Sequence, residues 1–296
     1  MPETAVTSGF NDLVVVVTGA GAGLGRQYAL DFASSGAVVV VNARRAEAAH
    51  AVVTAIENAG GKALPAVADA REGAKIVGAA IEACGRVDAL VVNAGVVQDR
   101  TFTRMSATEW SGVVDVHLGG AYSATAAAWP HMVAQGRGRI VLTTSGAGLH
   151  GNFGQANYAA AKAGIIGLAK TLAIEGARYG IGVNAVAPMA HTGMTHDVFN
   201  DDLRDGLPAA AVSPFVLALA HPACPRTGAV LETGGGWAAE LRWERAAGLR
   251  LHPAGLTAEA VLARFDELSD FAGGADHPTT TADSLGAALG RTIGGD

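Results

Sequence analysis

The hydrophobic residues of this chain are grouped into short β-branched runs that are separated by longer, alanine-rich stretches. Within each run the apolar residues are nearly continuous rather than alternating, which is typical of strands buried on both faces of a sheet. The runs predict strands at Leu13–Val17, Val38–Asn42, Ala63–Val67, Ala89–Val92, Arg139–Thr143, Gly182–Val186 and Ala229–Thr233.

The stretches between these runs have the length and composition of helices. They predict helices at Leu24–Ser34, Ala46–Ala59, Gly73–Cys84, Ala107–Gln135, with a break near Pro130, and Asn157–Tyr179. Glycines at 36, 60 and 180 stand where helix C-caps favour them. This alternation predicts an α/β fold, a Rossmann-type doubly wound parallel sheet of about seven strands with helices on both faces. Ligands bind such sheets at the carboxyl ends of the strands.

The regular alternation ends at Gly234-Gly235-Gly236. We expect one dinucleotide-binding domain over residues 1–236 and an extension over 237–296 that packs on the same domain. The extension predicts one helix, Ala258–Phe271, and its last residues are rich in Gly, Thr, Ala and Asp, which is typical of a loosely ordered end.

Composition narrows the classes of function. The formal net charge is −6 and no basic block occurs, which argues against nucleic-acid binding. The apolar runs are far shorter than the ~20 residues that span a bilayer, and the N-terminal residues do not resemble a signal peptide. Cys84 and Cys224 are isolated, the histidines lack metal-ligand spacing, and the last residues form no peroxisomal or endoplasmic-reticulum signal. We expect a cytoplasmic protein without a metal.

A glycine-rich segment follows the first strand and opens the first helix. Its spacing is TGxxxGxG, from Thr18 and Gly19 to Gly23, Leu24 and Gly25. Such glycines permit a tight turn and let a pyrophosphate approach the backbone at the helix N-terminus. The segment predicts a dinucleotide site; a glycine-rich turn without a ligand is the alternative.

Ser145, Tyr158 and Lys162 form a candidate catalytic set. Tyr158 and Lys162 are four residues apart in a predicted helix and therefore share a face. A nearby ammonium lowers the pKa of a phenol and makes it a usable acid–base group. Ser145 ends the fifth predicted strand and could hydrogen-bond the same substrate oxygen. Alone, the Tyr–Lys pair is weak evidence, because the spacing also occurs on surface helices.

Together these motifs resemble the short-chain dehydrogenase/reductase family over residues 10–236. The resemblance also includes Val92-Asn93-Ala94-Gly95 and the segment from Pro188 to Thr192. It implies that Asn93, Ala94 and Gly95 flank the adenosine ribose and that Pro188 and Thr192 hold the nicotinamide carboxamide. It implies further that Lys162 binds the nicotinamide ribose and that the chain forms a homodimer or homotetramer.

Several runs resemble more closely the (3R)-hydroxyacyl-CoA dehydrogenase unit of the peroxisomal multifunctional enzymes of type 2, also described as a 17β-hydroxysteroid dehydrogenase. The runs are 116–118, 128–132, 151–158 and 241–245. The resemblance implies interconversion of a (3R)-3-hydroxyacyl-CoA and its ketone, or of a hydroxysteroid. The alternatives are a 3-ketoacyl-acyl-carrier-protein reductase, a small alcohol dehydrogenase and, in another class, a non-enzymatic dinucleotide sensor, which would more often lack the tyrosine or the lysine.

Two positions depart from the wider family pattern. His117 stands where an asparagine is usual; it either supports catalysis by ordering water near Lys162 or is a packed helix histidine. Ala43, followed by Arg44 and Arg45, stands where NAD-binding members have an acidic residue. A guanidinium without a carboxylate favours NADP(H), whereas the closer resemblance implies NAD(H). Asp69, after the third strand, either contacts adenine or caps a helix.

Overall fold

The computed structural model describes residues 9–191, 205–252, 255–272 and 274–289. The chain divides along its sequence into two compact units, with the boundary between Glu240 and Leu241, and each unit is described by itself. The division predicted after residue 236 and the packing of the extension stay predictions.

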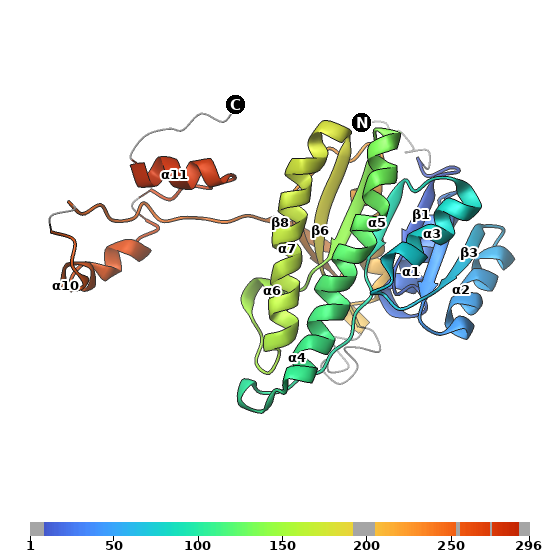
Figure 1. Ribbon diagram of the computed structural model, residues 1–296, viewed down its shortest axis with the longest axis horizontal. Helices are drawn as coiled ribbons and strands as arrows, with labels where there is room; N and C mark the ends of the chain where they lie inside the picture. The colour runs from blue at the N-terminus through green and yellow to red at the C-terminus, as the bar shows by residue number, and fades with distance from the viewer. Residues whose placement is uncertain (1–8, 192–204, 253–254, 273, 290–296) are drawn as a thin grey trace. The chain divides into compact units, whose positions relative to one another are not determined.

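The first unit is built on one sheet with the strand order β3-β2-β1-β4-β5-β6-β7-β8 (Figure 1). The strands are β1 Val14–Val17, β2 Val38–Ala43, β3 Lys62–Val67, β4 Ala89–Val92, β5 Gly138–Thr143, β6 Ile181–Met189, β7 Val230–Gly234 and β8 Trp237–Leu241. Strands β1 to β7 pair in parallel. The predicted doubly wound sheet is therefore confirmed, and the predicted strands agree closely with the first seven.

The eighth strand was not predicted. Strand β8 follows β7 after only Gly235 and Gly236, so the two neighbours must run antiparallel. Both glycines have positive φ, 57° and 82°, which suits a tight hairpin turn. The sheet thus ends in a hairpin whose second strand begins the predicted extension.

Helices cover both faces of the sheet. Helices α1, α2 and α9 pack beside one another on one face, and α3, α4, α5 and α7 pack together on the other. Their bounds are α1 Gly23–Ser34, α2 Ala46–Asn58, α3 Gly73–Cys84, α4 Ala107–Val114, α5 Gly120–Gln135, α6 Gly146–His150, α7 Ala156–Gly176 and α9 Ser213–Ala220, with short 3₁₀ turns η1 Phe102–Arg104, η3 Ala177–Tyr179 and η4 Ala209–Ala211.

The predicted break near Pro130 is wrong. Helix α5 continues through Pro130, whose freed hydrogen-bond acceptor, the carbonyl of Ala126, lies on the same exposed side and can be hydrated. The irregularity lies earlier, where a π-turn, η2 Asp115–Gly119, joins α4 to α5. π-Turns hold one extra residue per turn and are frequent at functional sites.

The second unit contains α10 Ala258–Leu262, the 3₁₀ turn η6 Phe265–Ser269 and α11 Thr281–Leu289. The predicted helix Ala258–Phe271 is thus divided in two. Asp283 accepts hydrogen bonds from the backbone N–H groups of Thr279 and Thr280, both at 2.7 Å, and its own N–H donates to Thr280 Oγ1 at 3.2 Å. This reciprocal pair is a capping box at the start of α11. This helix lies in the end that was expected to be loosely ordered.

Candidate active site

A cavity of about 500 Å³ opens at the carboxyl ends of the parallel strands. It lies where β1 is flanked by β2 and β4, at the point where the strand order reverses. The predicted cofactor residues that line it are Gly19, Gly23, Leu24, Arg44, Asp69, Asn93, Ala94, Gly95 and Pro188. The predicted catalytic residues Ser145, Tyr158, Lys162 and His117 line it as well. One cavity therefore brings together residues that lie at the ends of strands β1 to β6 or directly after them.

The glycines of the β1–α1 turn allow its backbone to pack closely against neighbouring backbone. A Cβ on Gly19 would lie 2.7 Å from the Cα of Ala94, and one on Gly25 would lie 2.4 Å from the carbonyl oxygen of Gly19. Ala22 precedes α1, and its methyl group cannot accept hydrogen bonds from the first turn. These N–H groups and the helix dipole suit an anionic group such as a pyrophosphate. The turn therefore fits a dinucleotide.

Thr18 does not line the cavity itself but hydrogen-bonds two residues that do. Its Oγ1 accepts hydrogen bonds from the backbone N–H groups of Asn93 at 3.0 Å and Ala94 at 3.1 Å. Asn42, which the sequence analysis missed, accepts from Gly19 N at 3.2 Å and donates to the carbonyl of Ala66 at 2.9 Å. The sequence feature that could have pointed to Asn42 is a single amide residue at the end of a run of valines. These bonds fix the backbone of the glycine-rich turn and of the loop after β4.

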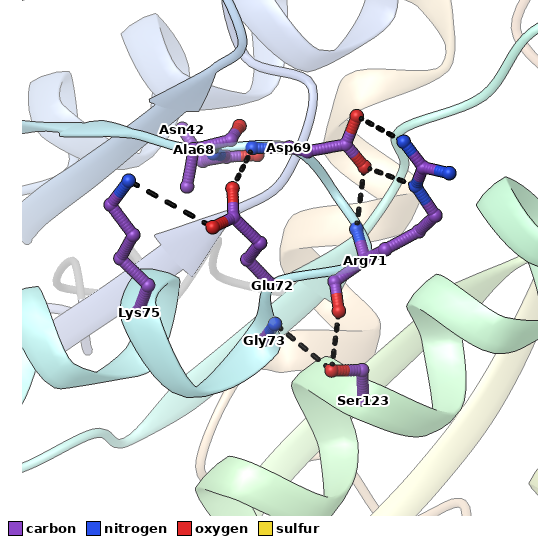
Figure 2. Close-up of polar contacts among 8 residues, drawn as sticks. All are labelled: Asn42, Ala68, Asp69, Arg71, Glu72, Gly73, Lys75 and Ser123. Atoms are coloured by element: carbon purple, nitrogen blue, oxygen red, sulfur yellow. Dashed lines mark hydrogen bonds and ion pairs between the residues drawn. The ribbon is translucent and has the colours of Figure 1, made fainter.

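Asp69, which also lines the cavity, is paired with Arg71 (Figure 2). The guanidinium binds both carboxylate oxygens, with Nε to Oδ1 at 2.7 Å and Nη2 to Oδ2 at 3.0 Å. Hydrogen bonds from Arg71, together with the charge of nearby Arg44, lower the pKa of Asp69 to about 2. Asp69 is thus a fixed carboxylate whose charge is largely neutralised.

The loop that carries this pair is held by α5. Ser123 Oγ donates to the carbonyl of Arg71 and accepts from Gly73 N, both at 2.9 Å (Figure 2). A Cβ on Gly73 would lie 2.2 Å from the carbonyl carbon of Ser123, so only glycine allows this approach. The position of Asp69 is therefore set by a neighbouring helix as well as by its own strand.

Lys162 is 3% exposed and lies beneath Tyr158. Its Nζ is 5.5 Å from the centroid of the Tyr158 ring and donates a hydrogen bond to the carbonyl of Thr143 at 2.6 Å. Burial lowers the pKa of Lys162 to about 7 because the charged ammonium loses hydration. Two further N–H donors of the ammonium remain for a ligand.

The pKa of Tyr158 is raised, contrary to the expected lowering by Lys162. Burial of the phenol is the largest cause, and the nearby charge of Asp99 adds to it. A hydrogen bond with Ser145 acts in the opposite direction and is too weak to reverse the shift. Tyr158 is therefore protonated at neutral pH in this structure, which suits a proton donor.

His117 lies in the π-turn and is 2% exposed. Its Nε2 is 3.1 Å from the backbone N and 2.7 Å from the carbonyl oxygen of Val96, while its ring meets the Tyr158 ring edge-on with centroids 5.0 Å apart. Burial, followed by the charge of Lys162, lowers the pKa of His117 to about 3, so the ring is neutral. A Cβ on Gly95 would lie 2.2 Å from Cε1 of this ring, so the ring leaves space for glycine only. His117 thus packs between the loop after β4 and the phenol.

Three further expectations concern Thr192, a metal site and a membrane-spanning helix. Thr192 lies outside the described residues. Within the part of the chain that the structure describes, no cluster of three or more His, Cys, Asp or Glu side chains could hold a metal ion. The helices of that same part include none long and apolar enough to cross a membrane.

A phenol, a hydroxyl and an ammonium that meet beside a pyrophosphate-binding turn can move a proton while a nicotinamide dinucleotide exchanges hydride with a carbon atom. The chain is thus an oxidoreductase that acts on CH–OH groups. A family model described as short chain dehydrogenase matches residues 13–203, and the chain belongs to that family.

Individual relatives agree with the fold and the family. The chain is 44% identical over 288 residues to the peroxisomal multifunctional enzyme type 2 of Mus musculus, which covers 94% of this chain and 39% of the mouse protein. The solved multifunctional enzyme type 2 of Drosophila melanogaster has a TM-score of 0.84 at 39% identity, covering 95% of this chain and 49% of that one. A short chain dehydrogenase from Mycobacterium avium has a TM-score of 0.79 at 38% identity, covering 91% and 97%.

Proposed function

We propose that this chain interconverts a (3R)-3-hydroxyacyl-CoA and the corresponding 3-ketoacyl-CoA. The observation that carries the proposal is the extent of the similarity to the mouse multifunctional enzyme, which reaches over 94% of this chain. The general family model ends at residue 203. The similarity therefore extends well beyond the part shared with dehydrogenases of many substrates, although this chain spans only 39% of the mouse protein.

Tyr158 is the acid–base group of the proposed reaction. A bound nicotinamide dinucleotide supplies the hydride donor or acceptor and, when oxidised, a positive charge. In ketone reduction the phenol of Tyr158 donates its proton to the substrate oxygen, and in oxidation the phenolate takes it back. The hydroxyl of Ser145, hydrogen-bonded with Tyr158, holds the same oxygen. The raised pKa keeps the phenol of Tyr158 protonated at neutral pH, which is the state that donates a proton in ketone reduction.

Lys162 and His117 support Tyr158 in different ways. Lys162 keeps one N–H on the carbonyl of Thr143 and directs the others to the nicotinamide ribose. Pro188, which lines the cavity, contacts the carboxamide. His117 holds the loop at Val96 through Nε2 and packs against the phenol. Its Nδ1 is buried and has no hydrogen-bond partner among the described residues, so the ring can also bind a water near Lys162.

We propose NADP(H) as the preferred cofactor. Asp69 is the one carboxylate among the described residues that line the cavity, and Arg71 neutralises it. With Asp69 paired to Arg71, Arg44 is left as a cation that lines the cavity and has no ion-pair partner among the described residues. Asn93, Ala94 and Gly95 flank the ribose, and Asp69 faces the adenine. This charge balance favours a 2′-phosphate.

Replacing Arg44 by alanine is expected to raise the KM for NADPH about 10- to 100-fold, because a charge-assisted bond contributes roughly 1.5–3 kcal/mol. The KM for NADH should change less than about threefold. Steady-state kinetics with both cofactors measure the ratio. Arg45→Ala is the matched control, because Arg45 is the next residue and does not line the cavity. Equal effects on NADPH and NADH would contradict the assignment.

The substrate is tested by comparing a 3-ketoacyl-CoA with a 17-ketosteroid, each with NADH and NADPH. We expect the thioester to be reduced with the higher kcat/KM, and reduction of the steroid alone would overturn the proposal. A 3-ketoacyl-acyl-carrier protein and a small ketone belong to the same panel, since both alternatives remain. Tight cofactor binding without turnover across the panel would favour a sensor.

Association and location stay predictions. Tyr122 on α5 and Ile174 on α7 are exposed large side chains on the helices expected to form a homodimer or homotetramer, which supports association there. The cytoplasmic location is a prediction from the sequence alone, whereas relatives such as the mouse enzyme are named as peroxisomal.

A further inference from the structure

Asn157, the residue before Tyr158, is a buried amide that the proposed reaction does not use. It lies in the first turn of α7 and is 0% exposed. Its Oδ1 accepts a hydrogen bond from the backbone N–H of Tyr158 at 2.7 Å. This N–H belongs to the first turn of the helix and has no intrahelical acceptor of its own.

The amide nitrogen of Asn157 joins α7 to two other segments. Nδ2 donates to the carbonyl of Gln98 at 3.1 Å, in the loop after β4, and to the carbonyl of Glu109 at 3.0 Å, in α4. Both hydrogens and one lone pair of the amide are therefore used on three backbone groups. A planar amide that is fixed at three points leaves its own backbone little freedom to shift.

Two neighbouring bonds strengthen the same connection. Arg100 N donates to the carbonyl of Gly154 at 2.7 Å, and Gln155 Nε2 donates to the Asp99 carboxylate at 2.8 Å. The loop after β4 that these bonds hold begins with Asn93, Ala94 and Gly95, which line the cavity. The cavity wall is thus tied directly to the start of the helix that carries the phenol.

We propose that Asn157 is a positioning residue that fixes the Tyr158 phenol relative to the loop after β4. The inference rests on the proposed function of Tyr158 as the acid–base group. Asn157 touches backbone only, so it acts through Tyr158. Because proton transfer requires a heavy-atom separation of about 2.6–3.2 Å, a displacement of the phenol by a fraction of this distance lowers the rate.

The test compares three variants at Asn157 that differ in the bonds they keep. Asn157→Ser keeps an acceptor for Tyr158 N and one donor, Asn157→Ala keeps neither, and Asn157→Asp keeps the acceptor and sets a carboxylate against two buried carbonyls. We expect kcat for ketone reduction to fall least for serine and about 10- to 100-fold or more for alanine and aspartate, with the Kd of the cofactor changed less than about threefold.

Asn184→Ala is the matched control for loss of a buried amide. Asn184 is also 0% exposed, donates to the carbonyl of Arg226 at 3.0 Å and accepts from Ala229 N at 3.1 Å. It lies in β6, and these partners do not line the cavity. We expect Asn184→Ala and Asn157→Ala to lower Tm comparably, while kcat changes less than about twofold in the Asn184 variant.

A second readout requires no substrate. The chain has four tyrosines, so ¹³Cζ-tyrosine NMR can follow Tyr158, assigned with Tyr158→Phe, through a pH titration. Burial raises the pKa of Tyr158, and a phenol released by Asn157→Ala would gain water. Its pKa should therefore move down towards the ordinary value of about 10, and Asn184→Ala should leave it unchanged.

The outcomes separate this inference from the proposed function. If the wild type reduces no substrate of the panel, the proposed function fails, and the NMR titration still tests Asn157. If Asn157→Ala and Asn184→Ala give the same kcat, the same pH profile and the same Tyr158 titration, Asn157 is a structural amide only and the inference is overturned.

Discussion

Tyr158→Phe is expected to lower kcat for ketone reduction by about 10²–10⁴-fold, which is the usual contribution of a general acid or base. The substitution removes one oxygen and keeps the ring. The edge-on contact with His117 and the position above Lys162 at 5.5 Å depend on the ring alone. The Kd of the cofactor, measured by fluorescence titration, should therefore change less than about twofold.

Tyr179→Phe is the matched control for this substitution. Tyr179 lies in η3, where its ring packs against Arg178 with 4.6 Å between the guanidinium carbon and the ring centroid. It does not line the cavity, so kcat should be retained. Turnover of Tyr158→Phe within tenfold of the wild type would exclude the phenol as the acid–base group.

Gly25→Ala is expected to impair cofactor binding more than 10-fold and to lower the free energy of unfolding by about 1–3 kcal/mol, the usual range for overpacking. The new Cβ would lie 2.4 Å from the carbonyl oxygen of Gly19 and 2.6 Å from Nδ2 of Asn93. The first is backbone and cannot rotate away, so the glycine-rich turn must open. Cofactor titration and urea unfolding measure the two effects.

Gly78→Ala provides the comparison at a glycine without such contacts. Gly78 lies in α3, and a Cβ there would meet no described atom within 4 Å. Alanine in a helix interior is more favourable than glycine by about 1 kcal/mol, so this variant should be as stable as the wild type or more so. A Gly25→Ala protein that binds cofactor normally would show that the turn does not approach a pyrophosphate.

The strands could be predicted because each buried run has a clear composition and sharp ends. Val14–Val17 and Ala89–Val92 were each placed within a residue. The π-turn Asp115–Gly119 could not be predicted, because its extra residue is set by the packing of His117 against Val96 and Tyr158. Strand β8 was missed since a short exposed edge strand lacks a continuous apolar run.

Most residues that the sequence predicted for the candidate site line one cavity, but their electrostatics were not predicted. Spacing places Tyr158 and Lys162 on one helical face, yet the direction of the Tyr158 pKa depends on burial, which only the structure provides. Asn42 and Asn157 were missed as site residues because an amide within a motif or at a strand end has no pattern of its own. Their roles follow from contacts with carbonyls 24 to 59 residues away in the sequence.

The π-turn and α5 form one continuous helical segment that contacts residues at both ends of the cavity. Its first part carries His117 against Tyr158, and two turns later Ser123 holds the loop of Asp69. The number of residues between these positions therefore sets the distance between the phenol and the loop of Asp69. Gaining or losing one residue here would rotate everything beyond it by about 100°. A change in the length of this helix would therefore displace the loop of Asp69 relative to the phenol.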